Sequence, residues 1–210
     1  MKKILSTIIL FTITISIAAQ DLKSIILSMP ESIVYGLEAS DKNLLAAGLG
    51  DTAKLTVERG RLGQITRLAV SSDFVSFKTS DAGTIEIKLL PLINDSQIIC
   101  VIRTVCADVC DSQLQFYTTK WIPISQGDLF PKKDKDWFIK SDVDRNSEEF
   151  KNAYAALDMN PIKMELSPKD TSLSVYYDIK KYLSEEDYKK IEPFLLENPK
   201  IFHWDKSAYN

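Results

Sequence analysis

Alternating apolar and polar residues are the feature that most limits what this chain can fold into. The period of two begins near Thr52 and is clear in the segments 54–58, 75–78 and 84–89, with a weaker run over 64–70. Such runs are typical of β-strands that bury one face and expose the other. The connections between them are too short for parallel crossovers, so we expect neighbouring strands to pair antiparallel.

One segment, from Gln97 to Cys106, is apolar on both faces rather than one. A strand of this kind is usually central in its sheet and covered on both sides. A further strand over 112–120 follows it. We therefore predict an antiparallel meander of about six strands, with 97–106 near its middle.

The segment before the meander has the spacing of short helices. Apolar residues at 22, 25, 26 and 29 lie on one helix face, and Pro30 interrupts the pattern. Ser28 and Glu31 could cap a second short helix that reaches Leu37, and Ser40 has the character of another N-cap. The prediction for residues 22–48 is two or three short helices.

The tail of the chain is predicted to contain both helices and strands. A helix is expected over 147–157, strands over 162–166, 173–179 and 200–204, and a helix that starts at Ser184. The fold class is therefore α+β: short N-terminal helices, the meander, and a C-terminal β-β-α-β extension. The predicted parts are a signal peptide (1–19), a helical start plus meander (20–131), a charged connector (132–147) and a smaller tail (148–210) packed on the same body. Periodicity alone leaves open whether the tail packs onto the first sheet or extends it.

The first nineteen residues have the layout of a secretory signal peptide. Lys2 and Lys3 precede an uncharged apolar run over 4–17, and Ala18 and Ala19 supply the small residues of a cleavage site. The run is shorter than the ~20 residues of a spanning helix, so a membrane anchor is the less favoured alternative. We expect a protein that is exported to the periplasm, the outer surface or the medium, with no membrane span after cleavage.

Charge supports a soluble protein and argues against nucleic acid as a partner. The chain has 26 basic and 29 acidic residues, and loss of residues 1–19 removes two lysines and no acid. The mature chain is therefore acidic, without the basic excess that nucleic-acid binding requires.

The cysteines predict one disulfide and one free thiol. If Cys106 opposes Cys110 across a three-residue loop, the resulting register places apolar residues beside apolar residues on the two strands. A disulfide between them would close the hairpin. The oxidising compartments that exported proteins reach allow such a bond to form. Cys100 lies roughly 20 Å along the same strand at ~3.3 Å per residue, too far to pair with Cys106, and is expected to be a buried thiol. The less favoured alternatives are a redox-active pair and a pair that stays reduced.

No metal, cofactor or catalytic motif is assembled in the sequence. The acids at 142 and 144 have the spacing of a calcium loop, but position 6 is Ser147 and position 12 is Ala153, which favours a linker with a helix cap. His203 is the single histidine, and no nucleophile-elbow or phosphate-loop motif accompanies it. We therefore expect no metal and no cofactor, and lean towards a protein that is not an enzyme.

Aromatic residues are concentrated in the tail. Tyr176, Phe202 and Trp204 are candidates for a platform that stacks on sugar rings or anchors a protein partner. Most aromatics at strand or helix spacing belong to the core, which is the favoured alternative.

Several segments resemble a family of exported Bacteroidales proteins that is catalogued as a domain of unknown function. The resemblance is carried most specifically by the run from Ile99 to Ser112, with both bridging cysteines, and also by 27–30, 87–92, 116–121 and 182–187. It covers nearly the whole mature chain and implies export, but it implies no activity.

The sequence thus favours an exported, non-catalytic module that binds a protein or a glycan. Two alternatives are a small-molecule carrier with an apolar pocket beneath Phe77, Ile87 and Phe116, and a hydrolase or isomerase whose site combines scattered acids with His203.

Overall fold

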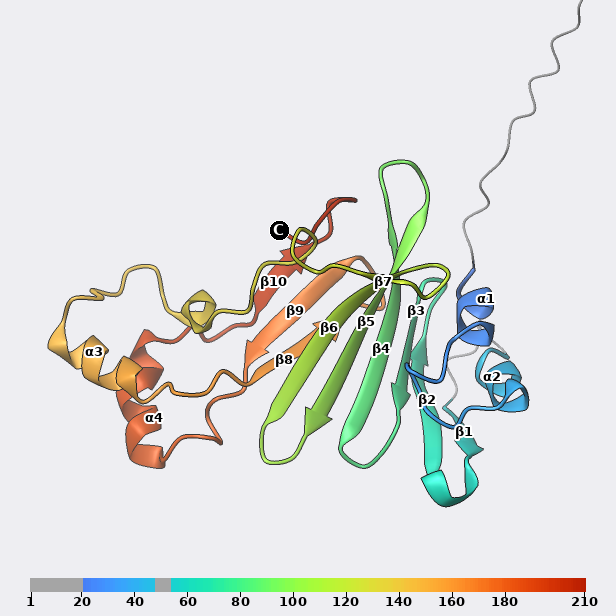
Figure 1. The fold of residues 1–210 in the computed structure, drawn as a ribbon. Coiled ribbons are helices and arrows are strands. Elements are labelled where there is room, and N and C mark those ends of the chain that lie inside the picture. The colour runs from blue at the N-terminus through green and yellow to red at the C-terminus, as the bar shows by residue number, and fades with distance from the viewer. Residues whose placement is uncertain (1–20, 48–53) are drawn as a thin grey trace, which may run out of the picture.

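A seven-stranded antiparallel sheet forms the centre of the protein (Figure 1), in a computed structural model that describes residues 21–47 and 54–210. Its strands follow one another in chain order, so the sheet is a simple meander. They are β1 (Leu55–Glu58), β2 (Gln64–Val70), β3 (Phe74–Lys78), β4 (Gly83–Pro91), β5 (Gln97–Cys106), β6 (Cys110–Thr118) and β7 (Pro123–Ile124). The predicted α+β class is confirmed, and the two-residue β7 is the strand that the sequence pattern missed. The predicted signal peptide lies outside the described residues.

The hairpin of β5 and β6 has the predicted register. Cys106 pairs with Cys110, and Ile102 with Leu114 farther along the ladder. Strand β5 is covered on both faces, as its two-sided apolar pattern indicated: Val101 faces one core cluster and Cys100 the other.

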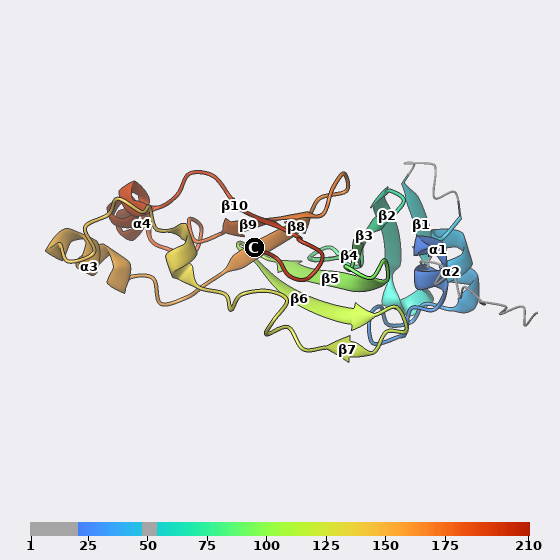
Figure 2. The same cartoon turned by 90° about the horizontal axis from the view of Figure 1, so that it is seen from above.

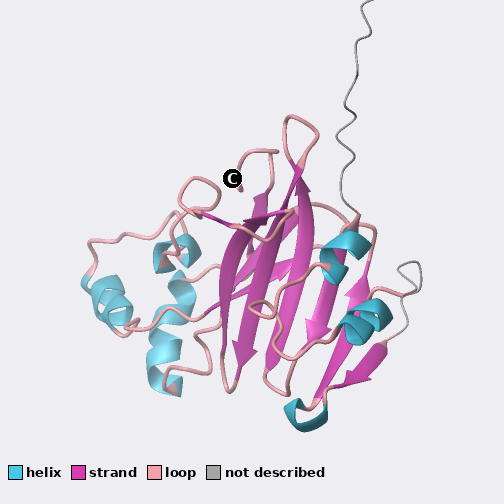
Figure 3. Cartoon of the chain, turned by 45° about the vertical axis from the view of Figure 1, so that its right-hand side comes forward, coloured by secondary structure: helices cyan, strands magenta, loops and turns pink. Residues whose placement is uncertain are grey.

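Two short helices cover one face of this sheet (Figure 3). They are α1 (Leu22–Leu27) and α2 (Ala39–Leu45), and their apolar side chains share a core cluster with the odd-numbered residues of β4 and β5. Two details of the prediction were wrong. No helix reaches Leu37, because the chain turns through Gly36 at a φ of 72°. The N-cap of α2 is Glu38, which forms a capping box with Asp41, and not Ser40.

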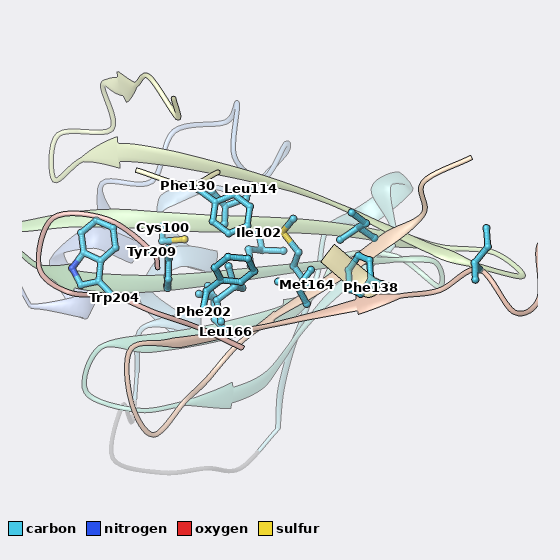
Figure 4. Close-up of a cluster of buried hydrophobic side chains, with 14 of the residues drawn as sticks. Cys100, Ile102, Leu114, Phe130, Phe138, Met164, Leu166, Phe202, Trp204 and Tyr209 are labelled. Atoms are coloured by element: carbon cyan, nitrogen blue, oxygen red, sulfur yellow. The ribbon is translucent and has the colours of Figure 1, made fainter. Parts of the chain in front are cut away.

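A second, three-stranded sheet lies on the opposite face (Figure 2). Its order is β10-β9-β8, with β8 at Ile162–Leu166, β9 at Ser172–Tyr177 and β10 at Lys200–His203. Side chains from both sheets, among them Cys100, Ile102, Met164 and Leu166, share one large core cluster (Figure 4). The tail therefore packs onto the first sheet and does not extend it.

The free edge of β8 is satisfied by side chains of the larger sheet. The backbone N–H groups of Ile162, Met164 and Leu166 point away from β9 and donate to Asp111 (3.2 Å), Ser112 (2.9 Å) and Glu86 (2.7 Å), respectively. Unpaired strand edges otherwise invite pairing with other chains. These bonds hold β8 across β6, β5 and β4.

The remaining helices lie beyond the second sheet, on the side away from α1 and α2 (Figure 1). They are α3 (Glu148–Ala155), α4 (Glu185–Ile191) and the 3-10 turns η2 (Lys135–Phe138) and η3 (Glu192–Phe194); a third 3-10 turn, η1 (Gly60–Leu62), joins β1 to β2. The side chains of Ser147 and Ser184 cap α3 and α4. Among residues 21–47 and 54–210, no helix combines the length and the hydropathy needed to cross a membrane.

Candidate functional site

A cleft of about 460 Å³ opens at the end of β9, between that strand and the segment that joins α4 to β10. Tyr176 and Tyr177 come from β9, Tyr188 from α4, and Phe138 from η2. We call it the aromatic cleft, because three tyrosines and a phenylalanine from three elements line it.

The floor of the aromatic cleft is a stacked pair of aromatic rings. Phe138 is buried, and its ring stacks on Tyr177 with centroids 5.0 Å apart and planes 10° apart. The Tyr177 hydroxyl donates to the carbonyl of Met159 at 3.2 Å, and burial raises the pKa of that phenol. The stacking contact and the hydrogen bond together define the orientation of the Tyr177 ring.

Charged and polar groups surround the mouth of the cleft. The Lys180 ammonium lies 5.1 Å from the centre of the half-buried Tyr188 ring. Burial raises the pKa of Tyr188, and the neighbouring Glu192 carboxylate adds to this effect. Glu197 and Asn198 complete an exposed rim of carboxylate and amide groups.

Tyr176 presents its ring from the outer face of the tail. The ammonium of Lys163 lies 5.6 Å from this ring and 2.5 Å from the carboxylate of Glu165. Burial raises the pKa of Tyr176, with Glu165 as a further cause, and the Glu165 contact raises the pKa of Lys163. The phenol is therefore neutral at physiological pH and available for stacking.

The cleft combines aromatic rings with amide and carboxylate groups. Aromatic faces, amides and carboxylates form the usual inventory for holding a polyhydroxylated ligand. The described residues that line the cleft include no serine, cysteine or histidine. Its charged side chains are those of Lys180, Glu192 and Glu197.

Only one of the three predicted platform residues reaches this cleft. Phe202 and Trp204 are 4% and 6% exposed and belong to the core, so the platform interpretation does not hold for them and the favoured core interpretation does. Phe202 packs edge-on against Phe130 at 5.2 Å, and the Trp204 indole donates to the carbonyl of Pro91 at 2.7 Å. Phe202 of β10 and Trp204, just after it, face the larger sheet, whereas Tyr176 lies on the outer face of β9.

The other cleft residues carried only weak signals in the sequence. Tyr188 follows Ser184 at helix spacing, and Phe138 is an aromatic residue within the charged connector. Neither pattern shows that the two side chains meet at the end of β9, because that contact joins elements far apart in the chain.

The cysteines adopt the expected arrangement. Cys106 and Cys110 form a disulfide across a non-hydrogen-bonded pair of the β5–β6 hairpin, with Cα atoms 4.0 Å apart. This is a structural staple between two strands, not a dithiol at a helix N-terminus. Cys100 is a free thiol in the core, where burial raises its pKa.

The residues considered for metal or acid–base chemistry are scattered. His203 is exposed, and its backbone pairs with Asn210. In the part of the chain that the structure describes, no three His, Cys, Asp or Glu side chains are grouped to hold a metal ion. Asp144 accepts the backbone N–H of Asn146 at 2.9 Å, and Ser147 caps α3, as a linker with a helix cap requires.

The carrier alternative called for a pocket beneath Phe77, Ile87 and Phe116. All three side chains are 0% exposed, and they lie in two core clusters on opposite faces of the sheet. Packed side chains occupy the place where that pocket was expected.

Comparison with known proteins places the chain in a family. Residues 14–209 match a family model described as "Protein of unknown function (DUF3256)". The chain belongs to this family. The match confirms the resemblance inferred from the cysteine-containing run and the neighbouring segments.

A solved structure supports the same conclusion about the fold. The structure of a domain of an uncharacterized protein from Porphyromonas gingivalis W83 is similar to this family member, with 28% sequence identity and a TM-score of 0.80. The alignment covers 90% of this chain and 98% of that one. No curated protein matches the chain.

Proposed function

We propose that this protein is an exported, non-catalytic module that binds a glycan in the aromatic cleft. One observation carries the proposal: Tyr176, Tyr177 and Tyr188, which come from two elements, converge on one cleft whose rim carries amide and carboxylate groups. Aromatic faces bind the apolar faces of sugar rings, and the polar rim would hydrogen-bond the hydroxyls.

Export is the second part of the proposal. It is supported by the order of charge, apolar run and small residues over 1–19, and by the disulfide, which persists in oxidising compartments. Expression of the full chain in a Gram-negative host tests it. We expect the envelope fraction to hold a protein lighter by about 19 residues, and a full-length mass would contradict the proposal.

Titration calorimetry with neutral hexasaccharides tests glycan binding. Maltohexaose, cellohexaose and chitohexaose are suitable probes, because each presents a run of sugar rings without charge. We expect one of them to bind. Tyr176→Ala and Tyr188→Ala should each weaken that binding about tenfold, since each removes one stacking face.

A matched control uses a tyrosine that lies elsewhere. Tyr35 is 68% exposed in the loop after α1, and Tyr35→Ala should leave sugar binding unchanged. If none of the sugars binds, or if all three variants behave alike, the cleft is not a glycan site. Release of shorter sugars during incubation would instead favour the hydrolase alternative.

A further inference from the structure

A different surface, the outer edge of β6, is partly unpaired. Backbone groups of β6 alternate between facing β5 and facing outward, and the outward set includes Cys110, Ser112, Leu114 and Phe116. Phe116 pairs with Ile124 of β7. The N–H of Cys110 donates to Asp178 at 2.5 Å, and the carbonyl of Ser112 accepts from Lys133.

Leu114 lies between these satisfied positions. Among the hydrogen bonds of the described residues, none uses its N–H or its carbonyl, and none uses the N–H of Ser112. In the β6–β7 register the residue opposite Leu114 would be Gln126. The chain leaves the sheet there, because Leu129 and Phe130 donate to the carbonyl of Gln126 and form a turn.

The space left by this departure is a groove of about 620 Å³. Three consecutive β6 residues, 113, 114 and 115, line it, together with Phe130 and Lys132 from the segment that follows β7. Successive side chains of a strand point to opposite faces, so a groove that touches three in a row runs along the strand edge. It therefore lies where an added strand would pair with β6.

The groove is positively charged. Arg103, Lys132 and Lys133 line it, and no carboxylate is among the described residues that do so. Lys133 is already engaged with Asp111 at 3.5 Å and with the Ser112 carbonyl. Arg103 donates to the carbonyl of Ser32 at 3.0 Å, and Lys132 is exposed. An anionic partner complements such a surface.

We propose that the groove binds an extended, acidic segment of a partner protein, which pairs as an additional strand with β6 at Leu114. Main-chain hydrogen bonds to an open strand edge supply affinity in this mode of recognition, and side-chain pockets supply specificity. Leu114 and Phe130 provide apolar contacts, and Lys132 and Arg103 provide the charge. The site does not depend on the aromatic cleft.

The edge of β6 is held in place at both ends. Disulfide Cys106–Cys110 joins the start of β6 to β5, and β7 holds its far end. A fixed edge loses little conformational freedom when a strand is added. A second copy of this chain is a poor occupant, because pairing β6 with β6 would bring two sets of these cations together.

The test uses the mature protein and two labelled eight-residue peptides. One alternates valine with glutamate, and the other alternates valine with lysine. We expect the glutamate peptide to bind, with fluorescence anisotropy showing weaker binding as salt rises, and the lysine peptide not to bind. Lys132→Glu should weaken binding about tenfold or more, whereas Lys169→Glu, the same charge change at an exposed site elsewhere, should not.

Two further measurements separate strand addition from charge attraction alone. Amide hydrogen exchange at Leu114 should slow when the glutamate peptide binds, while exchange at Gln113, whose N–H faces β5, should not change. N-methylation of alternate peptide residues should abolish binding in one set of positions and preserve it in the other, because only one set faces β6.

Several results would overturn the proposal. These are equal binding of the two peptides, no binding of either, binding without protection of Leu114, and equal effects of both methylation patterns. Sedimentation that shows a dimer with Leu114 already protected would assign the edge to a second copy instead.

Discussion

The hydroxyl of Ser112 accepts the backbone N–H of Met164 at 2.9 Å, and this hydrogen bond joins the two sheets. The same hydroxyl lies 2.7 Å from the Thr104 hydroxyl, and Ser112 is 0% exposed. Ser112 thus helps to determine where β8 crosses the larger sheet, and through β8 it positions the sheet that carries the aromatic cleft.

Replacing this serine should loosen the contact between the sheets. In Ser112→Ala the Met164 N–H and the Thr104 hydroxyl lose a buried partner, which costs about 2–3 kcal/mol of unfolding free energy. Chemical denaturation measures the loss. Ser125→Ala, at an exposed serine, should change stability by less than about 0.5 kcal/mol; equal effects of the two variants would contradict this role for Ser112.

Glu86 should make stability depend on pH. Burial raises the pKa of this carboxyl from 4.5 to about 7, against the opposing hydrogen bond from the Leu166 N–H. The folded state therefore keeps a proton that the unfolded chain has already released. This stabilisation is complete below about pH 4.5 and is lost as the pH rises through about 7, by roughly 3 kcal/mol.

Denaturation between about pH 5 and pH 8 measures the effect of Glu86. Glu86→Gln imitates the protonated side chain, so its stability should fall less with rising pH than that of the wild type. Glu149→Gln, at an exposed position, should follow the wild type. Parallel curves for all three proteins would show that Glu86 is not the responsible group.

The disulfide should stabilise the fold and leave one thiol. Thiol titration of the unfolded, oxidised protein should find one free group, Cys100, and three after reduction. Cys106→Ala/Cys110→Ala should lose about 2 kcal/mol by the loop-entropy estimate. The reduced wild type is the matched control and should lose a similar amount; three free thiols before reduction would exclude the bridge.

Replacing Lys88 should destabilise the protein less than replacing its partner Asp73. Its ammonium is buried 3.0 Å from Asp73 and donates to the Ser167 carbonyl at 3.0 Å. Asp73→Ala leaves a buried charge unpaired, at a cost of about 3 kcal/mol, whereas Lys88→Met removes that charge and should cost less.

The control for this comparison is Asp81→Ala, which breaks an exposed ion pair and should have little effect on unfolding. If Lys88→Met proves more damaging than Asp73→Ala, the ion pair and not the burial of charge dominates at this site.

Much of the architecture could be predicted because it is local. The period of two located most strands of the meander, and the β5–β6 register followed from matching apolar residues around Cys106 and Cys110. The prediction of a helix through Leu37 was wrong because Gly36 adopts a left-handed conformation, and the neighbouring residues do not indicate this. Strand β7 was missed because two residues are too few to display a period.

The order of residues by itself determined the strand pairing, the disulfide and the solvent-facing alternation, since each depends on positions close together in the chain. Only the tertiary structure decided that the tail lies across the first sheet. This packing buries Phe202 and Trp204 between the two sheets and leaves Tyr176 on the outer face of the tail. Alternation shows that a strand has a buried face, but not which distant element covers it. The aromatic cleft and the open edge of β6 both depend on that long-range packing.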